Sequence, residues 1–508
     1  MEGMTFSRLR SGGWQHAFCA IAATGVVSLA ACRGSSAPGA EARTLRIGTQ
    51  KTVEALPILT ELLYADPLLT VDWHGRPSPR LASDYQWQDD GRTLQVFIRQ
   101  GVQFHDGTPV TAAVVAEVLR NQRRAGGLQF LTTVETEGND IVRIHLSRPD
   151  AFLIDALGGT QIIKAENPDI GTGPFKLLAR SPAIRAERNG KYYRGIPGIE
   201  QVQVTTYDTA RAAWAAMMRG EVDMVTQVNR ESVEFLQGAA RFETYSSIRP
   251  FYIPLVFNVR HQILRNVEVR RALAEAIDRD EIVRRAMRGH GQVAEDPLWP
   301  FNWAYMPAAR RHSFDPGAAA SRLDAAGFPI RRAAQPDTMP SRFRIRCLFW
   351  TKDAQFERIA LMLQRQLATI GVDLVLEPVE QDLVEARIHS GDFDTYIYQH
   401  ASGKTFDYTY RFWHSDSTGA GAIQNAGYTG VNDVLDRLRA THGDAEVRVA
   451  VADLRQRFYE DVPAAFIAWP EATRAVDSRF NVGDASDPEI LANLWRWSIA
   501  KPQQRAAR

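Results

Sequence analysis

The chain carries few residue patterns that could support catalysis or hold a metal ion. It contains no G-x-S-x-G, H-E-x-x-H or C-x-x-C motif, which are the patterns typical of serine hydrolases, zinc proteases and paired-thiol sites. Gly403, Lys404 and Thr405 are similar to the end of a phosphate-binding loop, but Tyr398 stands where such a loop needs its first glycine. The sequence therefore predicts a protein that is not an enzyme, with no catalytic residue, no metal site and no cofactor.

The N-terminus has the pattern of a bacterial export signal. Arg8 and Arg10 form a short basic region, and the 14 residues 17–30 are apolar or small. A signal core has roughly 7–15 residues, whereas roughly 20 are needed to span a bilayer. The sequence LAAC that ends at Cys32 resembles a lipobox, in which the chain is cut before the cysteine and the cysteine is acylated. We expect residues 1–31 to be a lipoprotein signal peptide and Cys32 to carry the lipid; the alternative is a chance cysteine behind a signal core.

The residues after the signal suggest a protein that is anchored to a membrane and has a net charge near zero. Residues 32–43 are small and polar, which is typical of a flexible tether. Removal of residues 1–31 would take away two arginines and one glutamate and leave equal numbers of basic and acidic residues. Cys347 would be the only free thiol, so no intramolecular disulfide can form. We expect a lipid at Cys32 to attach the chain to a membrane, in the periplasm or at the cell surface.

The composition is that of a globular protein. The 508 residues are 45% hydrophobic and 23% charged, and a length of this order predicts about two to four domains. The formal net charge is +1, whereas a nucleic-acid-binding protein usually shows a strongly basic domain or face. Nucleic acid is therefore excluded as an expected partner.

Alternating strand and helix patterns must position any site that the chain holds. Residues 342–350 have a strand pattern, and residues 372–376 alternate as a second strand after Gly371, which stands where a left-handed helix cap is expected. The helical spacing between them is carried by Phe356, Ile359, Leu363, Leu367 and Ile370. Strand, helix and strand form a βαβ pattern, which predicts parallel pairing with a right-handed crossover.

Further elements are expected on the same grounds. The patterns predict helices over residues 111–120 and about 267–287, a half-buried strand over 141–146, and a strand pair through Gly101 over 95–103. We interpret Asp278 and Arg279 as a helix C-terminal or surface pair.

Short motifs in a fixed order resemble one known family. The most specific is IRQGVQFHDG at residues 98–107, and GTGPF at 171–175, VRRAL at 269–273 and DFD at 392–394 follow it. Val114 departs from the pattern, since the family usually has aspartate there. In this order the motifs resemble the family 5 extracellular solute-binding proteins of bacterial ABC importers, a group that includes oligopeptide, dipeptide and nickel binders.

The resemblance implies an α/β protein with the two-lobed fold of type II periplasmic binding proteins. It also implies an extra subdomain in the first lobe and a ligand cleft between lobes that close around the ligand. The implied boundaries are 44–60 and 169–262 for the first lobe, 61–168 for the extra subdomain, 263–477 for the second lobe and 478–508 for a C-terminal return to the first lobe.

The same resemblance implies a role in transport. The chain would capture a small solute, a peptide or peptide-like molecule, and deliver it as a monomer to the permease subunits of an ABC importer. One alternative is an exported ligand receptor or chaperone that is not tied to transport. A secreted enzyme on the same scaffold is another.

The ligand contacts are expected from aromatic walls with a few polar groups. Relatives that bind peptides capture the amino group with an acid shortly after the Phe-Asp segment, where this chain has Gly403; Asp407 is nearby and could serve if the loop is rearranged. The residues that we expect in the cleft are Trp350, Tyr398, His400, Asp407, Trp413 and Asn258. Core packing is the alternative for Trp350 and Trp413, and a backbone cap is the alternative for Asn258.

Overall fold

The structure is a computed structural model. It describes residues 43–51, 55–124, 128–229, 232–233, 236, 241–306, 311–330, 340–351, 353–415 and 426–500. The expected signal peptide over 1–31, Cys32 and the tether as far as residue 42 lie outside the described residues. None of the described helices is long and apolar enough to cross a membrane.

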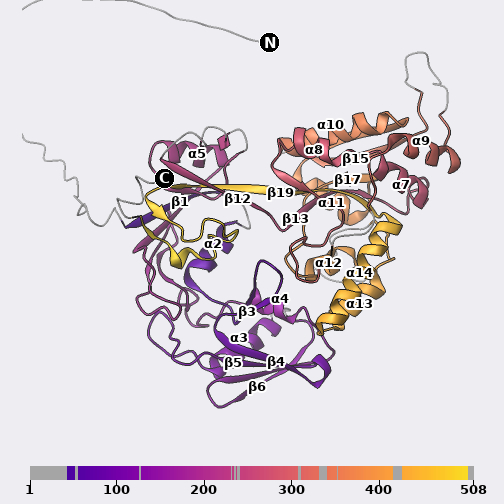
Figure 1. Ribbon diagram of the computed structural model, residues 1–508. Coiled ribbons are helices and arrows are strands. Elements are labelled where there is room, and N and C mark those ends of the chain that lie inside the picture. The colour runs from indigo at the N-terminus through magenta and orange to yellow at the C-terminus, as the bar shows by residue number, and fades with distance from the viewer. Residues whose placement is uncertain are drawn as a thin grey trace, which may run out of the picture. The chain divides into compact units, whose positions relative to one another are not determined.

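One large mixed sheet runs through most of the described chain (Figure 1). Ten of its strands follow one another by hydrogen bonding, and three more pair at its sides. The order is β16 (Val372–Val379), β15 (Phe343–Trp350), β17 (Thr395–Ile397), β13 (Phe251–Phe257), β19 (Ala464–Asp477), β11 (Met224–Val225), β1 (Thr44–Gln50), β10 (Gln201–Tyr207), β9 (Ile184–Arg188) and β8 (Phe175–Ala179), with β12 (Phe242–Ile248), β14 (Gly291–Val293) and β18 (His400–Ala401) at its sides.

Strand β19 joins the two halves of this sheet (Figure 1). Its first residues pair with β13 and β14, and its last residues pair with β12 and β11. Strands β12 and β13 follow each other along one edge of β19 and are separated only by Arg249 and Pro250. The sheet partners therefore change at residues 249–250, earlier in the chain than the expected lobe boundary at 262–263.

Each half of the sheet packs against an apolar cluster on both faces, since successive side chains of a strand point to opposite faces. In β13, Ile253, Leu255 and Phe257 pack into one apolar cluster, and Tyr252 and Val256 pack into another. The half around β1 is covered in the same way by two further clusters. The helices and short elements that complete the chain are α2 (Ala55–Tyr64), α5 (Ala210–Met218), α9 (Pro316–Ala325), α11 (Gln381–Ser390), α12 (Asp407–Trp413), α13 (Asn432–Ala440), α14 (Asp444–Asp461), β20 (Phe480–Asn481), η2 (Leu494–Arg496) and β21 (Ser498–Ile499).

A second sheet lies within the residues expected to form an extra subdomain. Its order is β4 (Ala82–Gln88), β5 (Thr93–Ile98), β7 (Ile141–Leu146) and β6 (Leu131–Glu137), with α3 (Ala112–Arg124) packed on it and η1 (Asp89–Gly91) between β4 and β5. The predicted strand pair through Gly101 is wrong. After β5 the chain forms a turn with positive φ at Gly101, and Gln103 makes only an isolated bridge to Pro109.

The predicted βαβ unit is confirmed. Strands β15 and β16 pair in parallel along their full length, and α10 (Ala354–Ala368) connects them. The expected stripe of α10 is buried. Gly371 has a φ of +77°, a left-handed conformation that costs glycine little.

The helix predicted over residues 267–287 is two helices, α7 (Val267–Glu275) and α8 (Arg279–Arg285). Asp278 separates them because its side chain caps α8 by accepting a hydrogen bond from the backbone of Glu281 at 2.8 Å. The interpretation of Asp278 and Arg279 as a C-terminal or surface pair is wrong. The Arg279 guanidinium donates to the carbonyls of Phe466 and Ala274, and burial lowers its pKa to about 10.

The GTGPF motif turns against the end of α2 at a position that only glycine fits. A Cβ at Gly173 would lie 2.5 Å from the carbonyl carbon of Tyr64 and 2.6 Å from the nitrogen of Ala65. The Gly173 nitrogen also donates to the Tyr64 carbonyl at 2.9 Å. The motif is therefore a packing feature that joins β8 to the segment before it.

We expect Gly173→Ala to lower the free energy of unfolding by about 3 kcal/mol, because the methyl group must displace backbone. Urea unfolding followed by circular dichroism measures this change. Gly190→Ala is the matched control, since nothing lies within 4 Å of a Cβ there. Equal stability of the two variants would contradict the packing argument.

Candidate functional site

Lys404 connects three segments that are far apart in sequence. Its Nζ donates to the carbonyl of Val71 at 3.1 Å and lies 2.5 Å from Oε1 of Glu489. Val71 ends β2 (Leu69–Val71), which pairs with β3 (Pro77–Pro79), whereas Glu489 belongs to the C-terminal segment. A charge-assisted bond of this kind is stronger than a neutral one, so Lys404 holds these segments together.

Two arginines extend this group along β12 and β19. Arg474 lies in β19 opposite Tyr245, and Arg249 follows β12, with its nitrogen bonded to the Pro470 carbonyl at 2.9 Å. Burial and the positive charge of Arg249 lower the pKa of Arg474, while the nearby Glu489 raises it. We call Val71, Arg249, Lys404, Arg474 and Glu489 the junction cluster; all five are half-buried.

The loop between β2 and β3 inserts into the segment after β14. The Trp299 indole donates to the Trp73 carbonyl at 2.9 Å, and the Asn302 amide donates to the Lys404 carbonyl at 2.8 Å. Gly75 passes so close that a Cβ there would lie 2.4 Å from both Asn302 Nδ2 and the Lys404 oxygen. This loop therefore holds Lys404 from one side.

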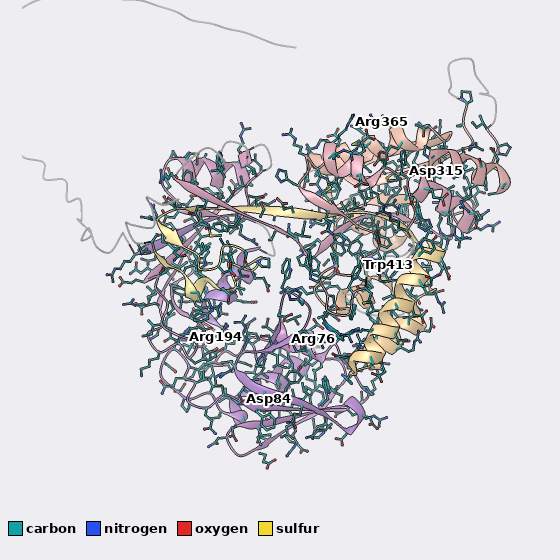
Figure 2. All side chains as sticks on the ribbon, in the orientation of Figure 1. Arg76, Asp84, Arg194, Asp315, Arg365 and Trp413 are labelled. Carbon is teal, nitrogen blue, oxygen red and sulfur yellow. The ribbon has the colours of Figure 1, made fainter. Side chains whose placement is uncertain are left out.

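Two ion pairs outside the junction cluster also connect residues of the segment 61–168 with α13 and α14. Arg76, which is labelled in Figure 2, lies in the segment before β3. It makes two hydrogen bonds of 2.7 Å to Asp444. Arg439 makes a bidentate pair with Asp150 at 2.9 and 3.0 Å and lies over the ring of Phe130. The Arg439–Asp150 pair is mostly buried, with side chains 15% and 10% exposed, so it is screened less by salt than a surface pair.

A pair of carboxyl groups lies in this contact as well. Thr405 donates to Asp155 in α4 (Leu153–Gly158) at 2.5 Å. Burial, and then the nearby Asp407, raise the pKa of Asp155 to about 7. Burial also raises the pKa of Asp407, which is held as an ion pair by Arg411 at 2.9 Å.

Two of the predicted contact residues, Trp413 and His400, are enclosed. Trp413, which is labelled in Figure 2, is 1% exposed. Its indole donates to the Tyr252 hydroxyl at 3.0 Å, which is the core packing given above as its alternative. His400 is 2% exposed, its ring lies 3.8 Å from that of Phe412, and burial holds its pKa well below the usual range. A neutral imidazole in this position supplies shape rather than charge.

Trp350 and Tyr398 are half-buried and lie near each other, with ring centroids 6.1 Å apart. The Tyr398 hydroxyl donates to Glu385 at 2.8 Å. The buried Trp350 indole nitrogen finds no hydrogen-bond partner among the described residues. Tyr398 also lies 5.7 Å from the ring of His400, so these three predicted residues form one aromatic group.

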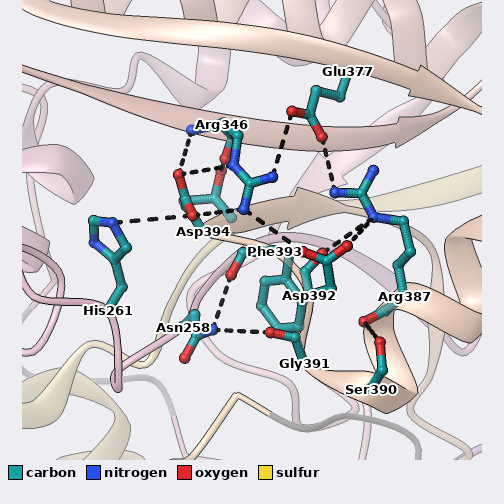
Figure 3. Close-up of polar contacts among 11 residues, drawn as sticks. Asn258, His261, Arg346, Glu377, Arg387, Ser390, Gly391, Asp392, Phe393 and Asp394 are labelled. Carbon is teal, nitrogen blue, oxygen red and sulfur yellow. Dashed lines mark hydrogen bonds and ion pairs between the residues drawn. The ribbon is translucent and has the colours of Figure 1, made fainter.

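Asn258 lies apart from that group and fills the capping role. Its amide donates to the Phe393 carbonyl at 2.8 Å and to the Gly391 carbonyl at 3.3 Å (Figure 3). Its side-chain oxygen accepts from the Arg260 nitrogen at 3.1 Å. Asp394, which follows this turn, pairs with Arg346 at 3.1 Å (Figure 3). The ligand roles of the six predicted residues remain predictions.

The structure thus places Lys404 and Arg474 in one cluster, which the sequence patterns did not predict. Lys404 appeared in the sequence only as part of a failed phosphate-loop pattern, and Arg474 had no signal because an arginine in a strand is common on exposed faces. Gly403, where an acid was expected, has a φ of +64°. A separate cavity of about 340 Å³ is lined by residues of α8, α14 and the segment after β14, and by none of the junction cluster.

We expect Gly75→Ala to separate the β2–β3 loop from Asn302 and Lys404, because the methyl group would overlap both. Small-angle scattering of the variant should give a larger radius of gyration than that of the wild type. Gly107→Ala is the control: Gly107 shares the positive φ but has nothing within 4 Å of a Cβ. An unchanged radius for Gly75→Ala would contradict the role of the loop.

We expect stability to fall as pH rises from about 4 through about 7, because the raised pKa of Asp155 means that its ionisation is less favourable in the folded chain than in the unfolded one. Asp155→Asn keeps an acceptor for Thr405 and removes this charge. The variant should be more stable than the wild type at pH 8, by at most about 4 kcal/mol, and no more stable at pH 4.

Urea unfolding at both pH values measures the effect. Asp208→Asn, at an exposed position, should keep the pH dependence of the wild type. The same pH dependence in Asp155→Asn would show that another group is responsible.

Comparison with known proteins places the chain among binding proteins. A model of the bacterial extracellular solute-binding proteins, family 5 (middle region), matches residues 76–422. The oligopeptide-binding protein AppA of Bacillus subtilis is 24% identical over 460 residues, which cover 83% of this chain and 83% of that protein. The dipeptide-binding protein of Escherichia coli is 24% identical over 77% of this chain and 80% of its own length.

Solved structures match almost the whole chain. The ABC transporter substrate binding protein CtaP of Listeria monocytogenes has a TM-score of 0.79 at 20% identity, covering 90% of this chain and 99% of that one. NikZ of Campylobacter jejuni, solved in complex with Ni(L-His), has a TM-score of 0.73 at 20% identity over the same shares. These likenesses confirm the predicted α/β fold class.

Proposed function

The chain belongs to the bacterial extracellular solute-binding proteins of family 5, and from this premise we propose that it captures a peptide or peptide-like solute at the junction cluster. Members of this family are the solute-binding components of ABC importers and are not enzymes. The absence of catalysis expected from the sequence is therefore confirmed by the family. The particular solute and its contacts belong to the proposal.

The observation that carries the proposal is the set of contacts made by Lys404. A single side chain meets the β2–β3 hairpin and the C-terminal segment, while β12, β13 and β19 connect the two halves of the sheet. If those strands bend, the contacts of Lys404 form or break together. A solute that prefers the joined arrangement then shifts the population toward it, by as much as its affinity differs between the arrangements.

A peptide-like solute is supported by the relatives but not by an amino-group site. The named ligands of relatives include oligopeptides, dipeptides and heme, and solved relatives hold a nonapeptide or agropinic acid. Asp407, the acid nearest to Gly403, is already paired with Arg411 and lies beside Asp155. A peptide here would therefore be held through groups other than its amino terminus.

The remaining parts of the proposal concern location and partners. A lipid at Cys32 would hold the chain at a membrane, in the periplasm or at the cell surface, and permease subunits of an importer would receive the solute. The chain would act as a monomer. A receptor or chaperone role without transport would use the same site, and it differs only in which partner takes the solute.

The test is binding of a library of two- to five-residue peptides and other small solutes, measured as a shift in Tm of the full chain in detergent. A true solute at 100 times its Kd should add about 2.7 kcal/mol of stability. Lys404→Gln should bind that solute roughly tenfold more weakly, because the joined arrangement loses its ion pair. Cys32→Ala should leave the membrane fraction and bind normally.

Two results would count against the proposal. If no library member stabilises the wild type, the chain does not capture solutes of these classes. If a bound peptide is cleaved, and one substitution in the junction cluster abolishes cleavage, the secreted-enzyme alternative is correct.

A further inference from the structure

We propose that Arg474, supported by Arg249, binds a carboxylate group of the solute, an assignment that rests on the proposed function and names the chemical group that the site selects. Arg474 is half-buried, and its Nε is buried without a hydrogen-bond partner. No carboxylate or carbonyl of the described residues bonds to its guanidinium. A guanidinium has five N–H donors and keeps its charge, and a buried Nε–H without an acceptor is costly.

The strand register places Arg249 on the same face. Ile248 pairs with Glu471 and Tyr245 with Arg474, and the Arg249 nitrogen bonds to the Pro470 carbonyl. Residues opposite each other in antiparallel strands share a face, and every second residue returns to it. Pro470 and Arg474 therefore lie on one face of β19 with Arg249 beside them. The guanidinium of Arg249 lies over the ring of Phe251, and its charge lowers the pKa of Arg474.

The nearby Glu489 does not bond to Arg474. Glu489 is close enough to raise the pKa of Arg474, but its Oε1 is held by Lys404 at 2.5 Å. The junction cluster thus holds three cationic side chains and one carboxylate. Like charges held together destabilise a protein unless an anion joins them, and a planar carboxylate matches the two parallel donors of a guanidinium.

The solute is therefore expected to carry at least one carboxylate. This group can be the C-terminus of a short peptide or the acid of a small molecule that is not a peptide. In either case the guanidinium recognises the charge and the planar shape of the group. The half-buried Trp73, whose ring packs against the fully buried Trp299, supplies apolar surface near Lys404.

The experiment compares acids with their amides on the full chain in detergent. The probes are trialanine and its C-terminal amide, and glutarate and glutaramide, with Kd measured by calorimetry. The wild type should prefer at least one acid over its amide by roughly ten- to a hundredfold, the range of a charge-assisted pair. Preference for trialanine identifies a peptide C-terminus, and preference for glutarate identifies a non-peptide acid.

Three variants test the assignment. Arg474→Gln should reduce the preference to about one, and Arg474→Lys should keep part of it, since the charge remains but the bidentate geometry is lost. Arg249→Gln, which leaves β19 intact, should weaken acid binding by about fivefold through its longer-range charge. Arg185→Gln, at an exposed strand position, should change nothing, and circular dichroism checks folding.

The opposite results would contradict either the carboxylate assignment alone or solute capture as well. Equal binding of acids and amides by the wild type, or wild-type acid binding by both Arg474→Gln and Arg249→Gln, overturns the carboxylate assignment and leaves solute capture standing. If none of the four probes and no member of the peptide library binds to the wild type, solute capture and the carboxylate assignment both fail.

Discussion

The structure depends on the backbone pairing of β19 with both halves of the main sheet. Its first half bonds to β13 and β14 and its second half to β12 and β11. Main-chain hydrogen bonds of this kind are too costly to leave unmade when buried, so the two halves cannot slide past each other. The edge formed by β12 and β13 is interrupted at Arg249 and Pro250, so the proposed bending of the two halves is expected there.

Polar contacts across the joined parts set how firmly that bend is held. Arg439–Asp150 is a mostly buried bidentate pair, and Lys404 bonds to two separate segments. Asp155 acts in the opposite direction, because its carboxyl must ionise beside Asp407 as pH rises through about 7. The contacts between these parts are thus stabilised by charge pairs and opposed by one half-buried acid, Asp155. A small difference of this kind is what a bound solute can shift.

Local patterns in the sequence predicted part of the local structure, and they did not predict contacts between distant segments. The β15–α10–β16 unit could be predicted because its helical stripe and Gly371 lie within 40 residues of one another in the chain. The helix over 267–287 failed because Asp278 prefers to cap a new helix rather than continue the old one. Lys404 could not be identified as a contact, since its partners Val71 and Glu489 lie 333 and 85 residues away. Trp413 is the type of residue that lines ligand clefts, but in the structure it is enclosed by aromatic residues of the core.

The overall charge of the chain and the charge of the junction cluster lead to different expectations, and the cluster is the better guide to the solute. A net charge of +1 over 508 residues gives no long-range attraction for an anion. Arg249, Lys404 and Arg474 nevertheless concentrate positive charge where burial reduces screening. A neutral solute would leave the Arg474 guanidinium without an acceptor, whereas a carboxylate would satisfy it and favour the same arrangement that Lys404 and Glu489 hold. The contact between Arg474 and a solute carboxylate would then both select the solute by its charge and favour the arrangement in which the two halves are joined.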